Sequence, residues 1–367
     1  MIRRLRNTVK ALISELMRYK KSPLRTLVNW HNAYRHGLFS PSEIRLYGLA
    51  DPSEGAKRQK SYGSKEIADS FYHKYNPVHA LKIISDKLIF EERCRKNDRA
   101  IPTTYGTYMN GEVKTPDGKI YKGRQELEKF FSMCLATPCV LKPNNGFLGQ
   151  NMFGLHRLEN GSIDINGEII SSNELLDRLL GDTEQASDDI KHSASAFQGL
   201  MIQKRLRNHD DISYMTGFDM LQTVRICTFV NDDNEVKVLF CFYKIAGEEG
   251  LADAFSLGKT GNMAAEVNVE TGQLKDVYIL DFEKNYFRTV SKNPKTGVDM
   301  AGFQLPHWQA CLDLVEKLAI DFLPLRTLGW DIAITDEGPV VLEGNENWTP
   351  MVPFHLSYDE IRSYGLK

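Results

Sequence analysis

The sequence predicts an α+β fold that begins with a helical, basic N-terminal region. The first observation is helical periodicity over residues 2–17, where apolar residues recur every three or four positions. The second is a succession of short β-rich runs after about residue 105. The third is a pair of hairpin signals at 223–245 and 330–343, each with apolar runs on both sides of a polar turn.

Length and composition indicate a globular protein with more than one structural unit. The 367 residues are 42% hydrophobic and 26% charged, and single cores stop growing at roughly 250–300 residues. No apolar run approaches the roughly 20 residues that span a bilayer, and the N-terminus lacks the features of a signal peptide, so a cytoplasmic location is expected. Six cysteines without a C-x-x-C pair predict buried free thiols and no structural zinc site.

Charge is unevenly distributed along the chain. Residues 1–40 contain nine lysines and arginines but one acid, Glu15, so this segment carries +8 while the rest of the chain carries −10. Nucleic acid is therefore not expected as a partner. Residues 2–17 predict a basic amphipathic helix, and residues 2–21 could lie on the anionic inner face of a membrane. The alternative is a helix that packs on the rest of the protein with its charges in water.

The order of the predicted elements divides the chain into three parts. Residues 1–75 form the helical basic region, residues 76–205 a first β-rich part and residues 206–367 a second one. Helices are expected near 80–96, 173–180 and 306–322, and a mobile polar loop at 181–197.

The last hairpin, GWDIAITDEGPVVLEGN, carries two carboxylates and an amide. Asp331 lies six residues before Glu337 and Glu343 lies six after it, so a turn centred there places the two carboxylates opposite each other. Asn345 projects from the same face as Glu343 if the strand continues. Three oxygen ligands on one face are typical of a magnesium site near a nucleotide. For the hairpin alone, a pair of surface carboxylates is the alternative.

Three further segments carry candidate ligand-binding residues. Lys142 ends an apolar strand before a turn with Gly146 and Gly149, where a lysine and backbone N–H groups could meet phosphate oxygens. A plain β-turn with a solvated lysine is the alternative. The extended segment at Gln203 could read an adenine edge, and an aspartate after it could bind a ribose hydroxyl. Arg225, in the strand TVRICTFV, could clamp a phosphate or be an ordinary strand arginine.

Taken in chain order, these motifs resemble the ATP-grasp superfamily. The shared features are Asp86-Lys87 before Ile101-Pro102, Lys142-Pro143 with its glycine-rich turn, a hinge strand, a strand arginine, and Asp331 with Glu343-x-Asn345. The C-terminal hairpin, VRICTF and LGKTGNMAAEVNVETG look most like the sugar-transfer-associated ATP-grasp proteins, relatives of α-L-glutamate ligases found with polysaccharide synthesis. The resemblance covers roughly residues 80–355. It implies an ATP-grasp fold, in which two α+β subdomains clasp ATP, with Mg²⁺ as the metal.

The resemblance also implies roles for individual residues. Lys87 and Lys142 would contact ATP phosphates, Arg225 would steady the transferred phosphoryl group, and Asp331, Glu343 and Asn345 would bind Mg²⁺. The hinge Gln203 to Leu206 would face adenine through the backbone of Lys204 and Leu206, with Leu342 packed on the base. Asp210 or Asp211 would contact the ribose, and Asn262 would lie near the phosphates.

The implied activity is ATP-dependent ligation of a carboxylate and an amine through an acyl phosphate, on a sugar acid or related carboxylate in surface-polysaccharide synthesis. Two alternatives stay open: a phosphotransferase acting on a sugar hydroxyl, and a non-catalytic ATP-binding scaffold. No oligomeric state is implied.

Two features depart from the family pattern. Residues 1–75 are helical and basic where most members have a βαβ domain that helps to bind substrate, so no acceptor pocket can be assigned. The hinge has Gln203 where many members have glutamate, which we expect to be tolerated because both side chains accept a hydrogen bond. Trp348 and the segment TPMVPFH follow the metal ligands, and they either line an acceptor site or pack the C-terminal helix.

Overall fold

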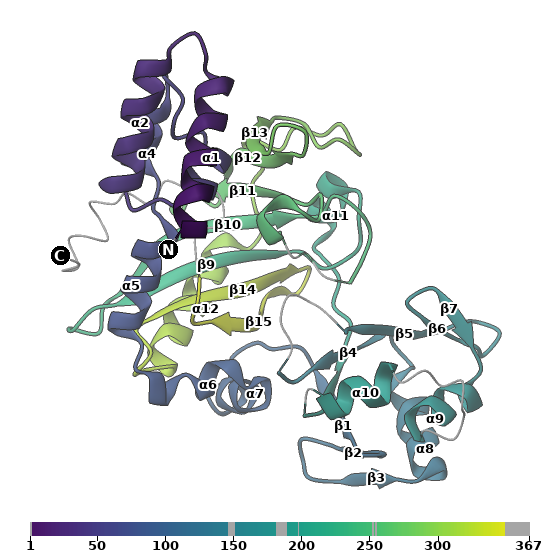
Figure 1. The fold of residues 1–367 in the computed structure, drawn as a ribbon. Coiled ribbons are helices and arrows are strands. Elements are labelled where there is room, and N and C mark those ends of the chain that lie inside the picture. Colours follow the sequence, from purple (N-terminus) through teal and green to yellow (C-terminus); the bar gives the residue numbers. More distant parts are fainter. Residues whose placement is uncertain are drawn as a thin grey trace.

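The computed structural model describes residues 2–145, 151–180, 189–196, 198–251, 253 and 255–348. These residues form two antiparallel sheets, a group of N-terminal helices, and further helices that follow in the chain (Figure 1). The predicted α+β class is therefore confirmed. The glycine-rich turn with Gly146 and Gly149 lies outside the described residues.

The larger sheet has seven antiparallel strands in the spatial order β13-β12-β11-β10-β9-β14-β15. The strands are β9 (Thr223–Val230), β10 (Val236–Ile245), β11 (Met263–Val267), β12 (Leu274–Asp281), β13 (Tyr286–Val290), β14 (Thr327–Thr335) and β15 (Gly338–Asn345). Helix α11 (Asp210–Thr216) precedes this sheet, and the short helix η2 (Ser256–Gly258) lies between β10 and β11. Both predicted hairpins, β9–β10 and β14–β15, are present.

The larger sheet buries both faces, and successive residues of a strand alternate between them. Val224 and Ile226 on β9 belong to one core with α12 (Trp308–Asp321), whereas Cys227 and Phe229 belong to a second core with the N-terminal helices. Arg225 therefore projects on the side of the N-terminal helices. This face of the sheet carries the candidate site.

The helices before the first strand are α1 (Ile2–Arg18), α2 (Pro23–Arg35), α3 (Pro41–Leu46), α4 (Gly55–Ser61), α5 (Lys65–Tyr75), η1 (Val78–Ala80), α6 (Lys82–Ser85) and α7 (Lys87–Lys96). Pro23 and Pro41 begin α2 and α3, because proline fits the first helical turn. No helix among the described residues is both long and apolar enough to cross a membrane. Ile84 and Phe90 of α6 and α7 pack in the core with α12, so residues 82–96 belong with the larger sheet and not with the first β-rich part.

The smaller sheet has eight antiparallel strands in the order β3-β2-β1-β8-β4-β5-β6-β7. The strands are β1 (Thr104–Met109), β2 (Glu112–Lys114), β3 (Ile120–Lys122), β4 (Cys139–Pro143), β5 (Phe153–Arg157), β6 (Ile163–Ile165), β7 (Glu168–Ile170) and β8 (Leu200–Lys204). Helices α8 (Arg124–Cys134), α9 (Ser172–Leu180) and α10 (Asp189–Ala196) contribute to its core. Residues 189–196 thus form a helix inside the stretch predicted as a loop, since Ile190 and Ala194 are buried against this core.

All six cysteines are free and buried, as the sequence predicts. Burial raises the pKa of Cys94, Cys134, Cys139 and Cys311 to about 12. Because the thiolate is the reactive form, we expect the native protein to resist iodoacetamide at pH 8 and the urea-unfolded protein to take up six labels in an intact-mass measurement. The unfolded thiols ionise first as pH rises, so these shifts also lower stability between about pH 9 and pH 12. Rapid labelling of the native protein would contradict the burial.

Candidate active site

A cavity of about 1730 Å³ is lined by residues of the larger sheet, the smaller sheet and the N-terminal helices. Typical ligand pockets measure roughly 300–1,000 Å³, so this cavity has room for more than one substrate. The predicted site residues that line it are Lys87, Lys142, Gln203, Lys204, Leu206, Arg225, Asp331, Leu342, Glu343 and Asn345. Folding therefore brings together residues that are up to 258 positions apart in the sequence.

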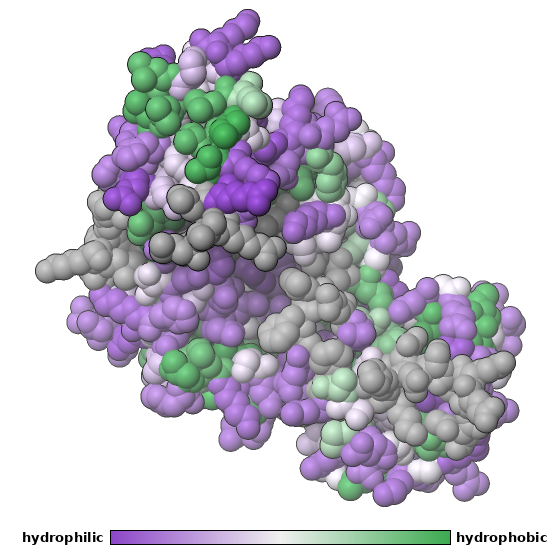
Figure 2. Space-filling view, viewed as in Figure 1, coloured by the Kyte–Doolittle hydropathy of each residue, from purple (hydrophilic) through white to green (hydrophobic). Residues whose placement is uncertain are grey.

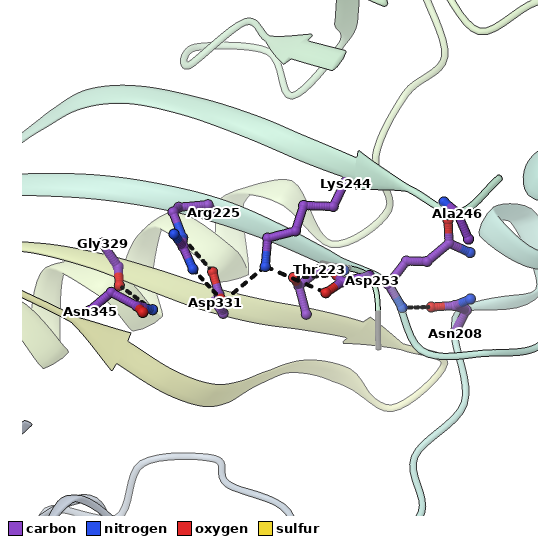
Figure 3. A network of polar contacts seen from close by, with 10 residues as sticks. Asn208, Thr223, Arg225, Lys244, Ala246, Asp253, Gly329, Asp331 and Asn345 are labelled. Carbon is purple, nitrogen blue, oxygen red and sulfur yellow. Dashed lines mark hydrogen bonds and ion pairs between the residues drawn. The ribbon is translucent and has the colours of Figure 1, made fainter. Parts of the chain in front are cut away.

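Arg225 and Asp331 form a bidentate ion pair on the larger sheet (Figure 3). The two residues face each other across β9 and β14. Nε and Nη2 of Arg225 donate to Oδ1 and Oδ2 of Asp331, each at 2.7 Å. The ammonium of Lys244, on β10, donates to the same Oδ2 at 2.9 Å. Asp331 and Lys244 are buried and the side chain of Arg225 is only 11% exposed, so each charge depends on its partners.

Lys244 connects this ion pair to a second carboxylate, Asp253. Its Nζ lies 3.5 Å from Oδ1 of Asp253, and Oδ2 of Asp253 accepts hydrogen bonds from the backbone amide and the hydroxyl of Thr223 at 2.7 and 2.6 Å. Burial alone would raise the pKa of Asp331, but Arg225 and Lys244 lower it well below its ordinary value. Asp331 is therefore ionised at neutral pH, and it holds two cations in fixed positions at the cavity.

Glu343 lies opposite Asp331, as the sequence predicts, because of a β-bulge. Near the turn, Thr335 pairs with Gly338, but Asp331 pairs with Glu343, so β15 contains one extra residue at Leu342. Without the bulge, Asp331 would face Leu342. Asn345 is two residues further along β15 and pairs with Gly329.

The donor atoms at this place suit Mg²⁺, with one restriction. Divalent cations of this kind prefer carboxylate and amide oxygens, which Glu343 and Asn345 offer to the cavity. Asp331 already accepts three hydrogen bonds from Arg225 and Lys244, of the roughly four that a carboxylate accepts. In the described part of the chain, no group of three His, Cys, Asp or Glu residues could hold a metal. Glu343 and Asn345 are therefore better placed than Asp331, which would have to change its contacts.

Two lysines that the resemblance assigns to the ATP phosphates also line the cavity. Lys87 is the first residue of α7, where Asp86 caps the helix, and its Nζ donates to the Asn144 carbonyl at 3.3 Å. Lys142 is near the end of β4. Burial lowers the pKa of both lysines, and the nearby Glu343 partly offsets that effect. A bound phosphate would favour the charged forms, so both lysines suit an anionic ligand.

Gln203, on β8, is held by a buried polar network. Its amide nitrogen donates to Glu91 and, at 3.0 Å, to Thr104, whose hydroxyl donates to Glu91 at 2.6 Å. Oε1 is then the atom of Gln203 that could accept a hydrogen bond from a base. The Lys204 N–H donates to the Thr103 carbonyl at 2.9 Å, so a backbone contact from Lys204 to adenine would have to use its carbonyl oxygen.

Gln203→Glu is expected to lower the free energy of unfolding by about 1–3 kcal/mol, because it places a second carboxylate beside buried Glu91. Burial already raises the pKa of Glu91. The exchanged variant Glu91→Gln/Gln203→Glu keeps one carboxylate and one amide and should recover most of the loss. Urea unfolding of the four proteins in this double-mutant cycle measures the coupling, with exposed Glu92→Gln as the control. If Gln203→Glu were as stable as the control variant, the result would contradict the network. It would then agree with the expectation from the sequence that either residue is tolerated at this position.

Three predicted residues do not line the cavity. Asp210 and Asp211 begin α11, and the Asp210 N–H donates at 3.0 Å to Asp336 in the turn of the β14–β15 hairpin. Asn262 is buried, and its Oδ1 accepts a hydrogen bond from the Gly247 N–H at 2.9 Å, which ties the loop after β10 to the loop before β11. These positions give no support to a ribose contact from Asp210 or Asp211, or to a phosphate contact from Asn262.

Trp348 packs in the core that the larger sheet shares with the N-terminal helices, and it is not among the residues that line the cavity. The side chain is fully buried, its Nε1 donates to the Thr327 hydroxyl at 2.8 Å, and its ring centroid lies 5.5 Å from that of Phe240. A Cβ at Gly329 would come within 2.8 Å of the Cβ of Trp348, so the strand with Asp331 requires glycine there. The segment TPMVPFH lies outside the described residues.

Sequence reasoning missed Lys244, Asp253 and Glu91. A signal was available for Lys244, since a lysine inside the apolar run FCFYKIA has to be buried with a partner. Asp253 and Glu91 carry no comparable local signal, because neither lies in an apolar run and some of their partners, Thr223 and Gln203, are 30 and 112 residues away.

Residues of both sheets line one cavity with two lysines and two opposed carboxylates, the residue types that the resemblance to ATP-grasp proteins implies. The sequence profile of the sugar-transfer associated ATP-grasp family matches residues 66–363. The chain belongs to this family, as its motifs predict. No curated protein matches the chain.

Several solved structures are similar to this chain at low identity. D-alanyl-alanine synthetase A from Vibrio cholerae is 10% identical with a TM-score of 0.40, over 77% of this chain and 61% of that one. N5-carboxyaminoimidazole synthetase from Staphylococcus aureus, complexed with ADP, is 10% identical with a TM-score of 0.38, over 73% and 46%. L-amino acid ligase from Bacillus licheniformis is 10% identical with a TM-score of 0.35, over 74% and 42%. The chain thus spans 42–61% of the lengths of these three proteins.

Proposed function

We propose that the protein is an ATP-dependent carboxylate–amine ligase that forms an amide through an acyl phosphate. The observation that carries the proposal is the single cavity in which Lys87, Lys142 and Arg225 accompany Asp331 and Glu343. Phosphoryl transfer needs neutralised phosphate charge and an in-line arrangement of donor and acceptor, with little covalent work by the protein. Membership of the ATP-grasp family supports the same reaction.

Each group of lining residues has its own role in the proposed reaction. Lys87 and Lys142 bind phosphate oxygens of ATP, and Glu343 with Asn345 holds Mg²⁺, which neutralises phosphate charge. Arg225 orients the group that is transferred, since its guanidinium can hold two oxygens of one anion. The smaller sheet covers the nucleotide and keeps water from the acyl phosphate.

The proposed chemistry has two steps. A carboxylate oxygen of the substrate attacks the γ-phosphorus of ATP, and the bond from that phosphorus to the bridging oxygen breaks, which releases ADP. The amine nitrogen then attacks the acyl carbon, the carbon–oxygen bond to phosphate breaks, and the nitrogen loses a proton. The products are an amide, ADP and inorganic phosphate.

The end of the cavity at the N-terminal helices supports a sugar acid as the carboxylate substrate. Tyr34, Arg35, Ser40 and Ser42 line this end, together with the acids Glu43, Glu66 and Asp69, of which Asp69 is paired with Lys65. An aromatic ring, a guanidinium and two hydroxyls suit a sugar that carries a carboxylate. The family's association with sugar transfer supports the same class of substrate. A place in surface-polysaccharide synthesis is part of the proposal.

The test is ADP release by the purified protein with MgATP and a panel of uronic acids, their sugar nucleotides and amino acids. Release that requires a carboxylate and gives a hydroxamate with hydroxylamine supports the ligase. Lys142→Met should abolish release, whereas exposed Lys129→Met should not. Phosphorylation of a sugar hydroxyl without a hydroxamate would replace the ligase by a phosphotransferase. ATP binding without turnover on the whole panel would leave a scaffold.

A further inference from the structure

The hairpin of α1 and α2 exposes large apolar side chains on its outer side. They are Val9 (46% exposed), Ile13 (45%) and Met17 (71%) on α1, and Leu24 (75%), Leu27 (41%) and Val28 (49%) on α2. Figure 2 shows hydrophobic side chains gathered over this hairpin, with hydrophilic ones beside them. Exposed apolar residues are common one at a time, but here six lie on two helices in contact.

The spacing of these residues makes one continuous stripe on each helix. Positions 9, 13 and 17 recur every four residues, and positions 27 and 28 lie three and four residues after position 24. The buried face of α2 is different, since Trp30 and Ala33 point into the core. Each helix therefore has apolar residues on its solvent side as well as on its packed side. Packing within the chain does not explain the apolar residues on the solvent side.

Basic side chains accompany the stripe. Arg6 and Lys10 are exposed on α1, and Lys20, Lys21 and Arg25 are exposed in the turn and at the start of α2. Glu15, the one acid among residues 1–40, is buried. The exposed surface of this hairpin, which we call the basic apolar surface, therefore carries positive charge with no exposed acid in residues 6–40.

We propose that the basic apolar surface, residues 6–28 of the α1–α2 hairpin, docks the protein on an anionic lipid bilayer. Apolar side chains flanked by lysine and arginine match the interfacial region of such a membrane, where acyl chains lie under negative headgroups. A second copy of the chain fits less well, because two surfaces of the same positive charge repel each other.

The docked orientation places the cavity near the bilayer. Asn7, Thr8 and Ala11 line the cavity, and at about 100° per residue they lie roughly opposite Val9, Ile13 and Met17 on α1. The bilayer and the cavity would then be separated by about one helix diameter, roughly 10 Å. The docking itself does not depend on the reaction in the cavity.

The test is cosedimentation of the full chain with phosphatidylcholine vesicles that contain or lack phosphatidylglycerol. We expect binding to the anionic vesicles, weakened by 0.5 M salt because screening shortens the reach of the charges. Met17→Ser/Leu24→Ser should weaken binding by about tenfold or more, whereas Val78→Ser/Ile169→Ser, which removes equally exposed apolar residues elsewhere, should not. Lys20→Glu/Lys21→Glu should also weaken it, and Lys129→Glu/Lys317→Glu should not.

Several outcomes would overturn the proposal. The first is no binding to either kind of vesicle, and the second is equal binding by the Met17/Leu24 variant and the wild type. The third is a change in the sedimentation coefficient of that variant, which would show that the surface mediates self-association and not lipid binding. A fall in the melting temperature of the Met17/Leu24 variant, beyond that of the Val78/Ile169 control, would mean that the chain covers the surface itself. The lysine pairs test the charge independently of this last outcome.

Discussion

Asp331→Asn is expected to lower the free energy of unfolding by about 3–5 kcal/mol, because it leaves the buried cations Arg225 and Lys244 without their carboxylate. Asp331 accepts hydrogen bonds from both residues at 2.7–2.9 Å, and none of the three side chains is substantially exposed. Urea unfolding of the ligand-free protein measures the loss. The control is Asp299→Asn, which removes the carboxylate of an exposed ion pair with Lys292 at 3.3 Å and should cost about 1 kcal/mol or less.

The same variant should change the response to acid. The pKa of Asp331 is lowered in the folded protein, so its contribution is fully present above the unfolded value of 3.8 and is lost as pH falls below it. Asp331→Asn should therefore show a smaller loss of stability between pH 4 and pH 2 than the wild type. Arg225→Met combined with Asp331→Asn should cost less than the sum of the two single changes, because each removes the same ion pair. Additive losses would contradict the pairing.

The network around Asp331 also shows which parts of the site a sequence can predict. The sequence predicts that Asp331 and Glu343 face each other, because both lie at equal distances from the polar turn of one short hairpin. This prediction is right only because β15 has a bulge at Leu342. No feature of the sequence indicates that bulge. The pairing of Asp331 with Arg225 joins strands 106 residues apart, and no local pattern sets the register of such distant strands.

The N-terminal helices illustrate a second limit on prediction. Helical periodicity predicts that residues 2–17 and most of 22–75 are helical, and the structure agrees. Periodicity cannot say that α1 lines the cavity with Asn7 and Thr8, because that depends on how the hairpin packs on the larger sheet. The site therefore emerges from strand register and helix packing together, while its residue types are visible in the sequence.

Glu343→Gln is expected to lower the rate of ADP formation by about 10²-fold or more and to raise the Mg²⁺ concentration required, because it replaces the anionic ligand with a neutral one. Its stability should change little, since Glu343 is only half-buried and takes no part in the Arg225–Asp331 pair. This combination separates a metal ligand from a structural carboxylate such as Asp331. The measurement is ADP formation against Mg²⁺ concentration, with a thermal melt of each protein.

Glu337→Gln is the matched control, since Glu337 lies exposed in the turn of the same hairpin and does not line the cavity. It should keep both the rate and the Mg²⁺ requirement of the wild type. If Glu343→Gln lost stability as Asp331→Asn does, with an unchanged Mg²⁺ requirement, Glu343 would be a counter-charge for Lys87 and Lys142 and not a metal ligand. The opposed carboxylates of β14 and β15 would then both serve to balance cations, and the metal would have to bind through phosphate oxygens and other residues.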